Sequence, residues 1–203
     1  MTTSEPEKLL PLRERGKEAR RARILAAASL LIRESGATDF SMQDLAKKAA
    51  VSLATTYNLI GVKAAVLYAL LDQSLDVLGA RQAGLEKIDS APRRVEAHCQ
   101  LAVRHFGSDA EYHRPLMRYL LGVYKPERRP LFMNRALEYW RLAFCPPGTI
   151  AEAKYLELAD AMHIAFTGAL DIWVHHEASS EELEQRALGI VRLLMRAGQA
   201  DPP

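Results

Sequence analysis

Residues 40–63, FSMQDLAKKAAVSLATTYNLIGVK, constrain the fold of this chain more than any other stretch. Two short helical patterns lie on either side of the small residues 49–51. The first helix is expected to begin after Ser41. Asp44 follows three positions later, which is the spacing of a capping box. Ser52 is placed to cap the second, Leu53–Leu59. Two short helices joined by so short a turn predict a helix-turn-helix, a motif that places its second helix in the major groove of DNA.

The rest of the chain is expected to be helical as well. Apolar residues recur at helical spacing, and no segment shows the sustained alternation of a half-buried strand. The fold class predicted is therefore all-α, with about nine helices. A first helix is expected over 17–34, ended by Gly36, and a fourth from Val62 towards Lys87. The five later helices are expected over about 90–106, 109–124, 126–144, 149–176 and 180–197, with Pro115 kinking one of them or marking its real start.

Charge divides the chain into parts. Residues 1–63 hold 11 Lys and Arg against 7 Asp and Glu, whereas the whole chain has a net charge of only +2. A basic segment on a slightly acidic remainder indicates a local surface for a polyanion. The expected organisation is a flexible arm over 1–16, a helix-turn-helix DNA-binding domain over 17–63, and a helical ligand-binding and dimerisation domain over 64–203.

Several functional classes find no support in the sequence. The two cysteines, Cys99 and Cys145, show no disulfide framework, and no apolar run is long enough to span a bilayer, so a cytoplasmic protein without a membrane partner is expected. No nucleophile motif, glycine-rich phosphate loop or HExxH is present, which disfavours an enzyme and a bound cofactor. The adjacent His175 and His176 do not share a helical face, and we expect no metal site.

The second short helix carries side chains suited to reading DNA. The major groove is about 12 Å wide, so the exposed side of a recognition helix must be small and hydrogen-bonding. Thr55, Tyr57 and Asn58 offer hydroxyl, phenol and amide groups, Ala54 permits close approach, and Ser52 and Thr56 are small and polar. The predicted base and backbone contacts are Ser52, Ala54, Thr55, Tyr57 and Asn58.

Phosphate contacts are expected at both ends of the motif. Ser41, Met42 and Gln43 lie where the first short helix begins, and free backbone N–H groups at a helix start bind phosphate. Lys63, at the start of the following helix, adds a full charge.

Residues 20–76 strongly resemble the TetR family of bacterial transcriptional regulators. The resemblance rests on DLAKKAAVS (44–52), on Tyr57 five residues after Ser52, and on Lys63 six residues after Tyr57. It implies a three-helix DNA-binding domain on a helical ligand-binding body that dimerises through its last two helices. It also implies base or backbone contacts from Met42, Gln43, Ala54, Thr55, Tyr57 and Asn58, and a phosphate contact from Lys63. Residues 58–62 depart from the family pattern. This departure predicts a poorer cap at the start of the helix that begins near Lys63.

The body is expected to bind a small, largely hydrophobic effector. Aromatic and methionine residues cluster over about 106–144, where they could line a pocket or simply form the core. The candidate ligand-binding residues are His98, Phe106, Tyr119, Tyr124, Trp140 and Phe144.

The last two helices are expected to form a homodimer face. Small residues at three- and four-residue spacing let helices approach closely, although the same strip could pack inside one chain. The candidate interface residues are Ala161, Ala165, Gly168, Ile172, Ala187, Ile190 and Leu194. A two-fold dimer would place two recognition helices about one DNA turn, or a multiple of it, apart, which predicts a palindromic operator.

The leading interpretation is a dimeric repressor that an effector releases from double-stranded DNA. One alternative is a ligand-binding protein or enzyme with a vestigial helix-turn-helix. Another is a regulator controlled by a protein partner instead of a small molecule.

Overall fold

The computed structural model describes residues 12–122, 128–148 and 152–199. Within these ranges the chain forms nine α-helices and one short 3-10 helix and no strand, which confirms the all-α prediction. The elements are α1 (Leu12–Ser35), α2 (Met42–Lys48), α3 (Leu53–Leu59), α4 (Lys63–Arg81), η1 (Leu85–Lys87), α5 (Ala91–Gly107), α6 (Ala110–Gly122), α7 (Arg129–Phe144), α8 (Ala153–Val174) and α9 (Ser180–Gln199).

Two predicted helix bounds are wrong. α1 begins at Leu12, so residues 12–16 are helical and do not belong to a flexible arm; residues 1–11 lie outside the described ranges. α4 ends at Arg81, short of Lys87, because Gly84 turns the backbone with a φ of 93° and leads into η1. A positive φ of this kind favours glycine, which has no Cβ to clash.

Other predicted bounds agree with the structure or lie outside its described part. Gly36 ends α1 with a φ of 65°, and its N–H donates to the carbonyl of Ile32 at 2.8 Å. Pro115 lies inside α6, which begins before it. The predicted helix ends at 124, 126 and 149 fall outside the described residues.

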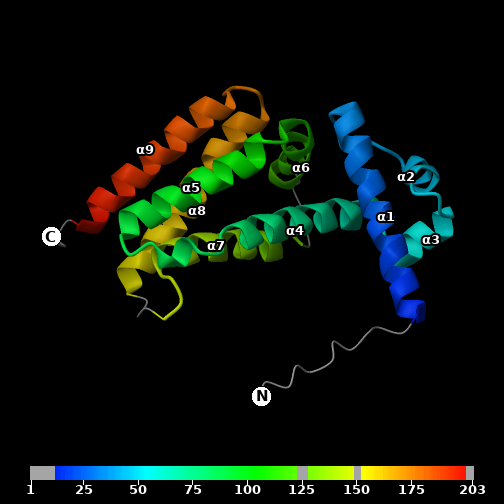
Figure 1. Ribbon diagram of the computed structural model, residues 1–203. Helices are drawn as coiled ribbons and strands as arrows, with labels where there is room; N and C mark the ends of the chain where they lie inside the picture. Colours follow the sequence, from blue (N-terminus) through cyan, green and yellow to red (C-terminus); the bar gives the residue numbers. More distant parts are fainter. Residues whose placement is uncertain (1–11, 123–127, 149–151, 200–203) are drawn as a thin grey trace, which may run out of the picture.

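The helices form a small unit beside a larger one, joined by α4 (Figure 1). The short helices α2 and α3 pack on α1 and on each other. α4 starts next to this group and runs along the body, where it packs on α5, α6 and α7. α8 packs on α7 and α9, and α9 also packs on α5. Among the described residues no single helix is both long and apolar enough to cross a membrane.

One hydrophobic cluster runs through both units. Ile24 on α1, Leu45 on α2 and Val66 on α4 are each 0% exposed, and the cluster continues through the body to Val191 on α9. Burying a large aliphatic side chain contributes about 1.5–3 kcal/mol. The helix-turn-helix is thus held on the body by shared core residues of α4.

Candidate functional site

The caps of the two short helices are those that the sequence predicts. The N–H of Asp44 donates to the Ser41 hydroxyl at 3.0 Å, and the Asp44 carboxylate accepts from the Ser41 N–H at 3.3 Å. This is a complete capping box. The N–H of Thr55 donates to the Ser52 hydroxyl at 3.0 Å, so Ser52 caps α3.

The turn between α2 and α3 depends on one residue with unusual backbone geometry. Ala50 has a φ of 51°, in the left-handed region that residues with a Cβ adopt at a cost. The next N–H, of Val51, donates to the carbonyl of Ala46 at 3.0 Å and closes the turn. Ala49 is buried beside it at 5% exposed, which fixes the turn against the core.

α3 has one face in the protein and one in solvent. Thr56 is 0% exposed, and its hydroxyl donates to the carbonyl of Ser52 at 3.2 Å. Arg21 on α1 donates to the carbonyl of Leu59 at 3.1 Å and holds the end of α3. The predicted DNA contacts Ala54, Tyr57 and Asn58 share the exposed face, together with Leu53, which the sequence reading left out.

Two predicted contacts are engaged with each other. The hydroxyls of Ser52 and Thr55 lie 2.7 Å apart, and Thr55 is only partly exposed. Only the hydroxyl that donates this hydrogen bond must rotate away before its proton can contact DNA; the accepting hydroxyl keeps its proton free.

The predicted phosphate contacts lie on both sides of α3. Ser41 and Gln43 are exposed at the start of α2, whereas Met42 is half-buried against the core. The ammonium of Lys63 lies 5.0 Å from the centre of the Phe40 ring, and burial lowers the pKa of this lysine, while Asp39 opposes that shift. The poorer cap before Lys63 is confirmed, because no side chain caps the start of α4.

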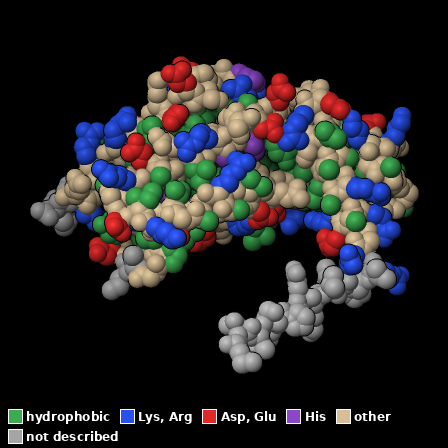
Figure 2. Space-filling model, in the orientation of Figure 1, with side chains coloured by type: hydrophobic (Ala, Val, Ile, Leu, Met, Phe, Trp, Pro, Cys, Tyr) green, Lys and Arg blue, Asp and Glu red, His purple; other side chains and the backbone are tan. Residues whose placement is uncertain are grey.

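Basic residues surround the small unit on the face shown in Figure 2. α1 carries exposed basic residues along its first half, at Arg13, Arg15, Lys17, Arg20 and Arg23, and α2 adds Lys47. Such side chains supply the sequence-independent part of an attraction to phosphate.

The body contains a small apolar cavity of about 40 Å³ among helices α4 to α8. It has room for a water molecule or two but not for a typical ligand, whose pockets are about 300–1,000 Å³. The lining residues are Leu75, Leu78, Ala102, Phe106, Met117, Leu121, Phe132, Met133, Ala136, Tyr139, Trp140, His163, Phe166, Thr167 and Leu170.

Of the six candidate ligand-binding residues, Phe106 and Trp140 line this cavity. His98 does not: it is 2% exposed, and its Nδ1 lies 2.9 Å from the carbonyl of Arg94. Phe144 is buried elsewhere in the core, and Tyr119 faces a surface cleft beside α6. Tyr124 lies outside the described residues.

The sequence reading missed the wall of the cavity that α8 provides. His163, Phe166, Thr167 and Leu170 lie on one side of this helix and line the cavity. The three- and four-residue spacing of these side chains indicates a packed face, whereas the sequence predicts α8 only as part of the dimer face. The carbonyl of His163 accepts from the Thr167 hydroxyl at 2.8 Å. Burial lowers the pKa of the His163 ring, and the Asp160 carboxylate opposes that shift.

The other side of α8 is open to solvent. Ile164 is 71% exposed, Gly168 is exposed, and Ala161, Ala165 and Ile172 are half-buried. On α9, Leu193 is 61% exposed, and Ile190 and Leu194 are half-buried. The assignment of Ala187 to an interface is wrong, because this residue is 0% exposed inside the single chain.

In the described ranges no cluster of three His, Cys, Asp or Glu could hold a metal ion.

Solved structures share this fold over nearly the whole chain. A TetR-family regulator from Syntrophomonas wolfei aligns with a TM-score of 0.71 at 19% identity, over 88% of this chain and 96% of the other. One from Pectobacterium atrosepticum gives 0.68 at 21% identity, over 96% and 100%. FadR of Thermus thermophilus, a TetR-family repressor solved with lauroyl-CoA, gives 0.69 at 19% identity, over 90% and 96%. Neither a protein-family model nor a curated protein sequence matches the chain. The chain therefore has the TetR-family fold.

Proposed function

We propose that this chain is a DNA-binding transcriptional regulator of the TetR family, with residues 17–63 as its DNA-binding domain and 64–203 as its ligand-binding and dimerisation domain. The observation that carries the proposal is the orientation of α3. Its Thr56 side is buried, and its Ala54, Tyr57 and Asn58 side is free to enter a major groove. Fold alone does not assign function, so the proposal rests on this site.

A homodimer would supply the second recognition helix. The apolar strip on α8, centred on Ile164, and the exposed Leu193 on α9 are suited to a four-helix contact between two chains. A two-fold dimer has two equivalent α3 helices, and such a dimer reads a palindromic operator.

The apolar cavity supports regulation by a hydrophobic effector. Its walls come from α4, which begins at Lys63, and from four helices of the body. A ligand larger than about 40 Å³ must push these helices apart, and α4 carries that displacement towards the DNA-binding domain. An effector that binds the displaced state more tightly would release the operator, and we propose that this release relieves repression. The lauroyl-CoA bound to FadR is one example of a ligand with a long apolar chain on this fold.

The test is a salt titration of the purified protein on the DNA upstream of its own gene. We expect a specific complex at least about 10³-fold tighter than that with a scrambled duplex, and a steep fall in affinity with salt. Equal affinity for both duplexes at every salt concentration would reject the proposed function. A duplex of matched length and base composition is the control.

A further inference from the structure

A cleft of about 350 Å³, lined mostly by polar residues, lies between the end of α1 and the body and shares no lining residue with the apolar cavity. α1 contributes Arg33, and α4 contributes Gln73, Ser74 and Arg81. The opposite wall comes from α5, α6 and the residues between them, at His105, Ser108, Asp109, Tyr112 and His113. Only one aliphatic side chain, Val77, lines it.

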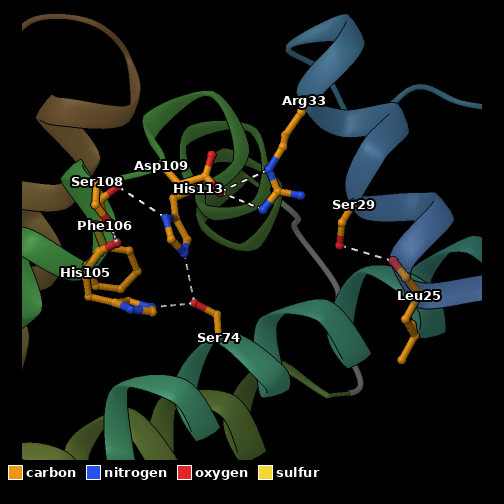
Figure 3. Close-up of polar contacts among 9 residues, drawn as sticks. All are labelled: Leu25, Ser29, Arg33, Ser74, His105, Phe106, Ser108, Asp109 and His113. Atoms are coloured by element: carbon orange, nitrogen blue, oxygen red, sulfur yellow. Dashed lines mark hydrogen bonds and ion pairs between the residues drawn. The ribbon is translucent and has the colours of Figure 1, made fainter. Parts of the chain in front are cut away.

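Two buried histidines meet one serine beside this cleft (Figure 3). The Ser74 hydroxyl lies 2.8 Å from Nε2 of His105 and 3.2 Å from Nε2 of His113. Nδ1 of His113 lies 3.2 Å from the carbonyl of Phe106, and a carbonyl only accepts, so Nδ1 carries the proton of this ring.

The remaining protons follow from that assignment. In the neutral ring Nε2 of His113 accepts from the Ser74 hydroxyl, and the Ser74 oxygen accepts from Nε2–H of His105. Nδ1 of His105 is then a bare acceptor, and this buried atom has no hydrogen-bond partner among the described residues. Burial lowers the pKa of both rings, so neither carries a charge at neutral pH.

The fixed charges of the cleft are therefore two guanidiniums and one carboxylate. Arg33 donates to one oxygen of Asp109 from Nε at 3.0 Å and from Nη2 at 2.6 Å. Its Nη1 has no hydrogen bond to any residue that the structure describes, so it can bind another group. The guanidinium of Arg81 forms no ion pair or hydrogen bond with any residue in the described ranges. The cleft thus keeps a net positive charge beside hydroxyl and imidazole groups.

We propose that this cleft binds a small oxyanion, the carboxylate or phosphate group of a metabolite, between Arg81 and Arg33. Guanidinium groups bind such anions through charge-assisted hydrogen bonds, and the volume of the cleft is at the lower end of small-molecule sites. The anion would face His105 and His113, and its charge favours the protonated form of both rings.

An anion in this position would contact both units of the molecule. Arg33 belongs to α1, which carries the helix-turn-helix, and Arg81 belongs to the end of α4 in the body. The ligand would hold α1 against the body from a site other than the apolar cavity. The anion site itself does not depend on the proposed DNA binding.

The test is a calorimetric titration of the full chain at pH 7 with inorganic phosphate and, separately, with citrate, at constant ionic strength set by chloride. We expect saturable binding of one anion per chain with a dissociation constant of about 1 mM or below for at least one of them. Arg81→Gln should weaken it roughly tenfold, because one charge-assisted contact is lost. Arg104→Gln is the matched control, since Arg104 is also exposed but does not line the cleft.

Imidazole signals in NMR spectra locate the anion independently. During the same titration the ring signals of His105 and His113 should move, while those of the exposed His175 should not. Absence of saturable binding, equal weakening by both arginine variants, or movement of the His175 signal alone would each overturn the proposal.

Discussion

Arg94 on α5 donates a hydrogen bond from Nε to the carbonyl of Ala143 at the end of α7, at a distance of 2.8 Å. The same guanidinium donates to the carbonyls of Phe144 at 3.3 Å and Ile88 at 2.7 Å. Arg94 is only 6% exposed and forms no ion pair with any described carboxylate. Its charge is instead placed at the C-terminal end of α7, where unpaired carbonyls and the helix dipole favour a cation.

Replacing this arginine should destabilise the protein. Arg94→Met removes three hydrogen bonds and leaves buried carbonyls unpaired, so we expect a loss of about 2–4 kcal/mol in the free energy of unfolding. Urea denaturation followed by circular dichroism measures it. Arg93→Met, at the exposed neighbour, should change the value by less than about 0.5 kcal/mol. Equal effects of the two substitutions would contradict this role of Arg94.

Stability should fall in mild acid. Burial lowers the pKa of His105 from 6.5 in the unfolded chain to about 4 in the folded one, and the nearby His113 and Arg81 act in the same direction. Between these values the unfolded state binds more protons, so the free energy of unfolding decreases as the pH falls from about 6.5 to about 4. Above about pH 7 the ring is neutral in both states, so its titration no longer changes the stability.

Urea midpoints measured at several pH values test that linkage. His105→Gln removes the titrating ring and keeps a donor for Ser74, so the dependence on pH between 4 and 6.5 should become shallower. His175→Asn, at an exposed ring, should leave the dependence unchanged. Identical pH profiles for the wild type and His105→Gln would contradict the assignment.

The turn of the helix-turn-helix should tolerate glycine at its strained position. Ala50 has a φ of 51°, and a residue with a Cβ pays about 1–2 kcal/mol for this left-handed conformation. Glycine removes that cost, but it also makes the unfolded chain more flexible, which offsets part of the stabilisation. We expect Ala50→Gly to raise the thermal midpoint by a few degrees or leave it unchanged. Ala49→Gly, at the buried neighbour with an ordinary φ of −80°, should lower it. A fall of the same size in both variants would show that the left-handed turn carries no strain.

The proposed dimer should depend on the exposed strip of α8. Ile164→Glu places a charge at a residue that is 71% exposed in the single chain, and burial of that charge in a contact between two chains is strongly unfavourable. Sedimentation should therefore give a monomer at micromolar concentration. Leu131→Glu, at a 63% exposed leucine on α7, should leave the dimer intact. A monomeric wild type, or a dimeric Ile164→Glu, would exclude this interface.

Local signals in the sequence predict much of the fold. The serine caps at Ser41 and Ser52 and the ending glycine Gly36 depend on neighbours within a few residues, so the sequence alone locates them. The exposed face of α3 follows in the same way from the helical spacing of its side chains.

Contacts between distant segments are not visible in the sequence. The bridge from Arg33 to Asp109 spans 76 positions, and Arg94 reaches a carbonyl 49 positions away. α8 has apolar residues on both of its sides, and only the packed structure separates the cavity wall at Phe166 from the exposed side at Ile164. Ala187 was misassigned for the same reason, since small residues suit both a core and an interface.

The most direct test of the central claim, that α3 reads DNA, is a selection of bound duplexes from a random library by the wild type and by two variants. The wild type should enrich a palindrome with half-sites about one or two DNA turns apart. Asn58→Ala should relax the preference at specific positions, whereas Lys63→Ala should weaken binding to all sequences alike. The claim would be contradicted if the wild type enriched no sequence from the library. It would also be contradicted if Asn58→Ala and Tyr57→Ala both selected the same palindrome as the wild type.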